Sequence, residues 1–157
     1  MASIDSVIDT IRTAIPTYSG FSTKAEILNP YSLEDNPDSF LTDSWGLLIG
    51  SGTRSAKDEL LINYEATTIR NVSVILCRAV YDVRGVGKQV NEQSKTLLAD
   101  CAIVRDNFLG SNRFGLLKSG EEITYVGDSG INFLGGNEAK FIYTQIDFTF
   151  EIIEQLT

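Results

Sequence analysis

Apolar residues follow a helical period at two places in this 157-residue chain. The first lies near the N-terminus, where five aliphatic residues recur with the spacing of one helix face: Ile4, Val7, Ile8, Ile11 and Ile15. Ser3 is a suitable cap for the first turn, and Pro16 ends the pattern. We therefore expect a helix over about residues 3–14.

The second helical pattern is longer and follows the segment Gly85-Val86-Gly87. Its apolar positions are Val90, Leu97, Leu98, Cys101, Val104 and Phe108. Gly110 then ends the pattern, which predicts a helix over about residues 86–109. At about 1.5 Å per residue, such a helix is about 36 Å long and can cross a whole sheet.

Alternating apolar and polar positions fill the C-terminal part of the chain. We expect a β-meander with strands over residues 121–126 and 131–134, turns at 127–130 and 135–137, and a long strand over 139–153. Along the long strand, apolar residues alternate with polar ones: Ile142, Ile146, Phe148, Phe150 and Ile152 against Tyr143, Gln145, Asp147, Thr149 and Glu151. One face is then core and the other faces solvent. Because the strand would be about 50 Å long, we expect part of it to pair beyond its own sheet.

Residues 59–81 are rich in β-branched and aromatic residues, with a polar interruption near residues 66–71. This composition predicts two strands. The second is apolar on both faces, with Val72, Val74, Leu76 and Val80 on one and Ile75, Cys77, Ala79 and Tyr81 on the other. A strand of that kind is expected at the centre of a sheet.

Residues 17–56 break these patterns with recurring Gly, Ser, Pro, Asn and Asp. We expect a long connection that holds two short strands, Ala25–Leu28 and Trp45–Ile49. Its aromatic residues include Tyr31, Phe40 and Trp45. Two interpretations of these three residues are open: a satellite hydrophobic cluster under the loop, or an aromatic anchor for a protein partner.

Together these patterns predict a single domain over residues 1–157 with an α+β fold. Its mainly antiparallel sheet is covered by a short N-terminal helix and one long central helix. Hydrophobic residues make up 43% and charged residues 22% of the chain, which is an ordinary globular composition.

The chain is acidic, with 13 Lys and Arg against 21 Asp and Glu and a net charge of -8. This is the wrong sign for neutralising phosphates, so we expect no nucleic-acid sequence recognition and no membrane binding. No apolar run reaches the ~18 residues of a membrane span, and the first residues lack the basic start of a signal peptide. Cys77 and Cys101 each lie in an apolar run, which predicts two buried free thiols in a reducing cytoplasm.

The chain has no histidine, which removes Ser-His-Asp and Cys-His catalysis and histidine metal sites. The segment Gly85-Val86-Gly87-Lys88 lacks the further Gly and the Ser or Thr of a nucleotide-binding P-loop. Carboxylates cluster at Glu34, Asp35, Asp38 and Asp43, but their spacing matches no EF-hand and is typical of turns. We expect no catalytic residue, no cofactor and no metal.

Three segments stand out within this order of elements: NPYSLEDNP at residues 29–37, WGLLIG at 45–50 and IYTQIDFTFEI at 142–152. With the order of helices and strands, they give a chain that resembles the tail terminator proteins of long-tailed bacteriophages, the lambda-type tail terminator family. The resemblance covers nearly the whole chain.

The resemblance implies an assembly role and no enzymatic activity. Subunits would form a homohexameric ring, one face of which binds the tail tube protein and stops its polymerisation. The other face would accept the head-tail connector protein. The protein would then belong to the tail and neck of the virion, after assembly in the host cytoplasm.

Such a ring needs head-to-tail contacts between two different patches of each subunit. Loop character places the expected partner contacts in the connection at 29–52 and in the two turns, at Tyr31, Phe40, Trp45, Asp128 and Asn137. Three other functions stay open: another neck, head-closure or tail-completion protein, a small carboxylate- or metal-dependent enzyme or binding domain, and a stand-alone adaptor domain.

Overall fold

A six-stranded sheet forms the centre of the structure, a computed structural model that describes residues 3–37, 41, 43–56, 65–80, 86–110, 113–116, 118–134 and 141–155. The strands are β1 (Ala25–Glu26), β2 (Ser44–Ala56), β3 (Glu65–Ala79), β4 (Glu122–Asp128), β5 (Asn132–Leu134) and β6 (Phe141–Gln155). Their order is β1-β2-β3-β6-β4, and β5 also pairs with β6. Every pair is antiparallel except β1 with β2.

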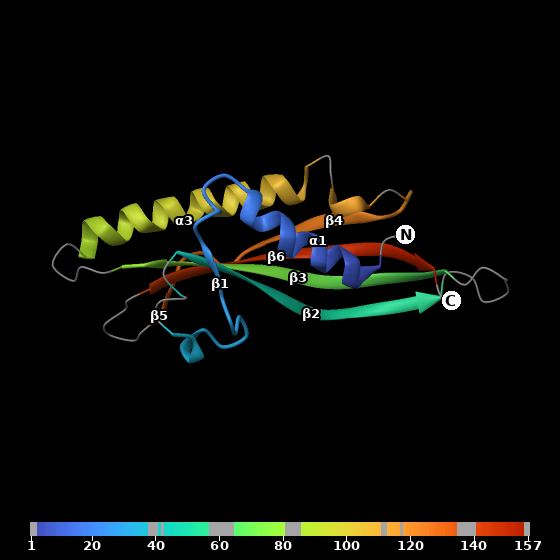
Figure 1. Ribbon diagram of the computed structural model, residues 1–157, viewed down its shortest axis with the longest axis horizontal. Helices are drawn as coiled ribbons and strands as arrows, with labels where there is room; N and C mark the ends of the chain where they lie inside the picture. The colour runs from blue at the N-terminus through green and yellow to red at the C-terminus, as the bar shows by residue number, and fades with distance from the viewer. Residues whose placement is uncertain are drawn as a thin grey trace.

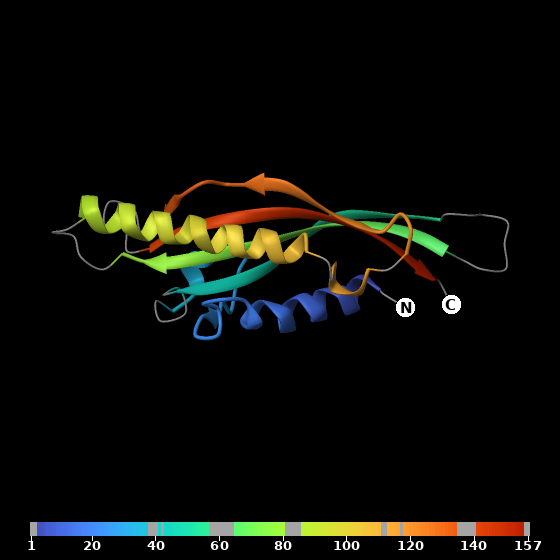
Figure 2. The ribbon, with the colours of Figure 1, turned by 90° about the horizontal axis from the view of Figure 1, so that it is seen from above.

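Two helices cover one face of this sheet, α1 (Ile4–Ala14) and α3 (Val86–Phe108). Figures 1 and 2 show both lying along the sheet, with the two ends of the chain at the same end of the molecule. Single-turn 3-10 helices occupy Ile15–Thr17, Leu33–Asp35 and Arg113–Gly115. The predicted α+β fold with a mainly antiparallel sheet is confirmed.

Helix α1 begins and ends close to where its sequence pattern does. The Ser3 hydroxyl accepts a hydrogen bond from the Ser6 amide, and the Ser6 hydroxyl accepts one from the Ser3 amide, which closes a capping box. The Ile4 amide donates to a carboxylate oxygen of Glu154 at 2.9 Å. This carboxylate lies at the positive end of the helix dipole, so it ties the first turn to the last strand.

Helix α3 is confirmed over its whole length, but its predicted apolar face was one residue too wide. Leu97 is fully buried, whereas Leu98 is 49% exposed. Successive helical residues lie about 100° apart, and Leu98 points to the flank of the helix that the sheet does not cover. The buried apolar positions described in α3 are Leu97, Cys101, Val104 and Phe108, and Asp100 is buried with them.

Strands β3 and β6 pair residue by residue over their full length, from Glu65↔Gln155 to Ala79↔Phe141. The prediction that a polar interruption near residues 66–71 separates two strands was therefore wrong for the described part, residues 65–80. The polar side chains continue the ladder, since the Thr149 hydroxyl donates to the Asn71 side chain at 3.1 Å. Strand β3 is as long as β6 and occupies one edge of it completely, while the expectation that part of β6 pairs beyond its own sheet stays a prediction.

Strand β2 runs well past the predicted end at Ile49, and β1 is shorter than expected. A β-bulge between Ile49 and Gly52 carries β2 through its glycine-rich segment. A Cβ at Gly52 would lie 2.2 Å from the Ile69 carbonyl oxygen, so this position requires glycine. The glycines that suggested the end of a strand mark a bulge inside it.

The predicted β-meander is also corrected. Strands β4 and β5 do not pair with each other, and both pair with β6, on the edge that β3 leaves free. The predicted turn at 127–130 is thus wrong in part, because residues 127–128 belong to β4 and only residues 129–131 interrupt the edge; there the Ser129 amide donates to the Gln145 carbonyl at 2.9 Å. The predicted turn at 135–137 lies outside the described residues.

The core divides into a large cluster under the helices and a small one on the other face. In the large cluster, Phe108 of α3 stacks on Phe148 of β6 with ring centroids 4.4 Å apart, and Phe114 meets Phe108 edge-on. The small cluster contains Ile27, Leu41, Ile75, Cys77, Ala79 and Phe141. Strand β3 contributes to both clusters, as its two apolar faces predicted.

The neighbouring leucines of α3 provide a matched test of this packing. Leu97→Ala should lower the free energy of unfolding by about 2–5 kcal/mol, because it leaves a cavity in the large cluster. Leu98→Ala should change it by less than about 1 kcal/mol, because that side chain is half in solvent. Chemical denaturation of both variants measures the difference, and equal losses would contradict the assigned helix face.

Candidate functional site

Four charged side chains from distant parts of the chain form an ion network beside α3. Lys24 Nζ lies 2.5 Å from Asp43 Oδ1 and 3.3 Å from Asp100 Oδ2. Arg78 Nε lies 3.1 Å from the same Asp100 oxygen, and its Nη2 lies 3.5 Å from Asp43. The Lys24 side chain is only 2% exposed, and the two cations balance the two carboxylates. Balanced pairing of this kind is what allows a lysine to be buried.

The network joins four parts of the fold. Lys24 precedes β1 and Asp43 precedes β2. Arg78 lies near the end of β3, and Asp100 lies in α3. Asp43 has a left-handed backbone, with φ of 53°, which aspartate tolerates better than most residues. No spacing in the sequence signals this cluster, and sequence reasoning assigned only Asp43 to a carboxylate group, with other partners.

Removing the buried cation tests what the network contributes. Lys24→Met keeps the side-chain length but leaves Asp43 and Asp100 facing Arg78 alone, so the free energy of unfolding should fall by about 3 kcal/mol. Glu26→Gln is the control, because its partner Arg12 and Glu26 itself are both about half exposed and such pairs contribute less than about 1 kcal/mol. Urea denaturation of the two variants should separate them clearly, and an equal effect would contradict a structural role for Lys24.

A second polar cluster shapes the loop that covers the other face of the sheet. The buried Asn36 side chain donates to the carbonyls of Asn29 and Ser32 at 2.8 and 2.9 Å, and accepts from the Asn29 amide at 2.8 Å. These bonds close the loop 29–36 and carry Tyr31 to the outer edge of β2. There the Tyr31 hydroxyl bonds both the amide and the carbonyl of Ile49, at 3.1 and 3.2 Å.

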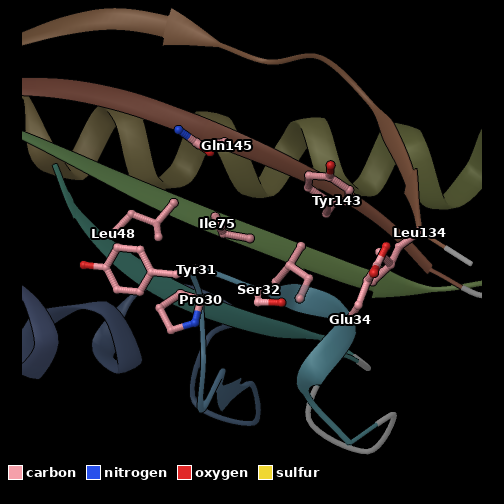
Figure 3. A pocket seen from close by; sticks show the side chains of 10 residues that line it. Pro30, Tyr31, Ser32, Glu34, Leu48, Ile75, Leu134, Tyr143 and Gln145 are labelled. Atoms are coloured by element: carbon pink, nitrogen blue, oxygen red, sulfur yellow. The ribbon is translucent and has the colours of Figure 1, made fainter.

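A pocket of about 420 Å³ lies between this loop and the strands (Figure 3). Pro30 and Tyr31 form its loop side, and Ile75, Tyr143 and Gln145 form its floor on β3 and β6. Glu34 supplies the one carboxylate among its lining residues. The pocket is open and mixes apolar with polar groups, which suits a protruding side chain of a protein partner.

Beyond the pocket, this sheet face also carries polar and charged side chains. Asp147 Oδ1 accepts hydrogen bonds from the Ser73 hydroxyl at 2.6 Å and from the side-chain amide of Gln145 at 2.8 Å. Glu122 of β4 lies directly opposite Glu151 of β6, on the same face. Like charges in that position repel, so this part of the face favours a cationic or solvated neighbour.

The predicted contact residues do not form one site. Trp45 is only 2% exposed and belongs to the large core cluster, so its prediction as a surface anchor was wrong. It begins a β-strand whose alternate residues face the helices, which the irregular surrounding sequence hid. Tyr31 is exposed at the β2 edge, and Asp128 is exposed at the end of β4. Phe40 and Asn137 lie outside the described residues.

Five of the eight large exposed hydrophobic residues in the described structure lie at the two opposite edges of the sheet. Leu28, which is 68% exposed, lies with Tyr31 and Ile49 beside the outer edge of β2. Val126 and Phe133 are exposed on β4 and β5, at the other edge. Exposed apolar residues grouped in this way are typical of protein contact surfaces. Sequence reasoning missed Leu28, Val126 and Phe133 because it counted them as strand or turn residues.

The two cysteines are buried and free, as predicted, and lie on opposite faces of the sheet. Burial raises the pKa of Cys77 to about 12 and the pKa of Cys101 to about 12. Neutral thiols of this kind are poor nucleophiles. Within the described residues, no group of three or more Cys, Asp or Glu side chains is placed to hold a metal ion.

Thiol labelling tests this burial. At pH 8 the folded protein should react with a thiol reagent far more slowly than in denaturant, while an exposed control thiol from Thr10→Cys should react at once. Unfolded cysteine ionises near pH ~8.5, so the free energy of unfolding should fall as pH rises above that value towards 12. Rapid labelling of the unsubstituted folded protein at pH 8 would contradict the burial of both thiols.

Comparison with known protein families and curated proteins does not identify a relative of this chain. No protein-family model and no curated protein matches the chain. Of the helices in the part that the structure describes, none is long and apolar enough to cross a membrane.

Proposed function

We propose that this protein is a virion structural protein, a tail terminator that forms a homohexameric ring. In this role the ring caps the tail tube, stops its polymerisation and joins the tail to the head connector. Its partners are other copies of itself, the tail tube protein and the connector protein. It acts through surfaces and catalyses no reaction.

The observation that carries the proposal is the pair of apolar patches at opposite sheet edges. A ring needs two different patches on each subunit that fit each other, because a patch that only fits itself produces a closed dimer. Leu28, Tyr31 and Ile49 beside one edge, and Val126 and Phe133 spaced along the other, offer two different surfaces on each subunit. They lie on different strands and in different chemical surroundings.

The shape of the sheet supports the same role. The ends of β2 and β3 that lie far from α3 extend well past that helix (Figure 2). Strand β6 extends there with them, and this projecting end of the sheet can reach an adjacent ring while α3 covers the rest. The open polar face and its pocket add a further surface for the tube or connector protein. A head-closure or tail-completion protein would share the ring but would not stop tube growth.

The native mass tests the ring directly. Light scattering after size exclusion, over a range of protein and salt concentrations, should detect a species of six times the chain mass of 17.3 kDa. Negative-stain images of that species should show closed rings. A chain that stays monomeric under all these conditions would contradict the proposal.

A pair of leucine variants shows whether the edge patch makes the contact. Leu28→Glu should abolish the large species, because it places a charge in one patch. Leu98→Glu is the matched control, since Leu98 is also exposed but lies on α3, away from both edges. Loss of the ring in both variants, or in neither, would contradict a contact through the sheet edges.

A further inference from the structure

The described part of the sheet ends in an unpaired strand edge on each side. On one side, β1 pairs only with Ser44 and Trp45, so the rest of the outer edge of β2 has no neighbouring strand within the described residues. On the other side, β4 pairs only with β6. An unpaired edge presents backbone N–H and C=O groups that can pair with another strand.

The free stretches on the two sides are similar in length. On β2, the Tyr31 hydroxyl bonds the backbone amide and carbonyl of Ile49, and the bulge ends at Gly52. Residues 52–56 beyond it form a regular stretch whose outer edge pairs with no described strand. On β4, the regular stretch before its own irregularity is residues 122–125. Each side can therefore form a ladder of four or five residues.

Strand direction makes these two edges compatible with each other. Strands β2, β3, β6 and β4 follow one another in the sheet, and each is antiparallel to the next. Strand β4 therefore runs opposite to β2. When a second copy is placed beside the first in the same orientation, its β2 meets β4 in the antiparallel sense, and the alternation continues without a break.

We propose that residues 52–56 of one copy pair as an antiparallel strand with residues 122–125 of the next copy. This inference deepens the proposed ring and rests on it, because it assigns the two surfaces that join neighbouring subunits. Of the exposed apolar residues, Ile49 on one side and Val126 on the other lie next to the new ladder, and Leu28 and Phe133 lie further along the same two edges.

A head-to-tail arrangement explains the surface better than a two-fold one. Pairing β2 with β2 of a partner would bury only the first apolar patch and leave Val126 and Phe133 in solvent. Pairing β2 with β4 covers both patches on every subunit of a closed ring. One irregularity in β2 and one in β4 limit the free stretch on each side to a few residues. The edges therefore cannot pair over a long, unspecific length.

Cysteine cross-linking distinguishes these arrangements. Thr53 and Thr124 are exposed and lie on the same face of the sheet, in the two free stretches. Thr53→Cys and Thr124→Cys are prepared separately and together, and a short bis-maleimide links thiols that come close. The native thiols of Cys77 and Cys101 are buried and do not interfere. Thr10→Cys, on the outer side of α1, is the control for random collision.

The mixture of the two single variants should give a cross-linked dimer that neither gives alone, and the double variant should give a ladder of larger species. A dimer from Thr53→Cys alone would show a two-fold contact and overturn the inference. Rings in light scattering without cross-links in the mixture would overturn the edge pairing and leave the terminator proposal standing. A chain with neither rings nor cross-links would overturn both.

Discussion

The continuous pairing of β3 with β6 is the constraint on which the rest of the structure depends. Fifteen residues of each strand pair without a shift in register, so every side chain on one face is committed to the helices and every side chain on the other to the loop or solvent. Phe148 and Phe150 thereby meet Phe108 of α3, and Glu154 reaches the start of α1. A slip of one residue would exchange the two faces and separate both helices from their contacts.

Polar groups hold the irregular part of the chain against this ladder. The ion network of Lys24, Asp43, Arg78 and Asp100 connects the segment before β1 to β3 and α3, and Asn36 closes the loop that carries Tyr31. Apolar burial alone leaves the path of a short segment poorly defined. A buried lysine, in contrast, must lie beside its carboxylate partners and so has few alternative positions. The loop is thus fixed closely enough to place a side chain on the backbone of an edge strand.

The surfaces that remain are the ones from which we propose an assembly role. The helices cover one face of the sheet, the loop covers a portion of the other, and five of the eight large exposed hydrophobic residues of the described structure lie at its two edges. On the helix side, Lys24 and Arg78 are paired with carboxylates, and the two cysteine thiols are buried. A head-to-tail ring uses surfaces of this kind fully, because each subunit contributes one edge and receives the other.

The sequence by itself determined both helices, the central position of β3 and the two faces of β6, because each depends on a local period of apolar residues. It also predicted buried free cysteines, since their neighbours are apolar. Tertiary structure decided what depends on distant partners. Strand β3 stays continuous through polar residues because β6 pairs with them, and glycines lie inside β2 because β3 approaches closely at Gly52. Trp45 lies in the core and Lys24 finds two carboxylates because the chain folds back on itself, and no local period carries that information.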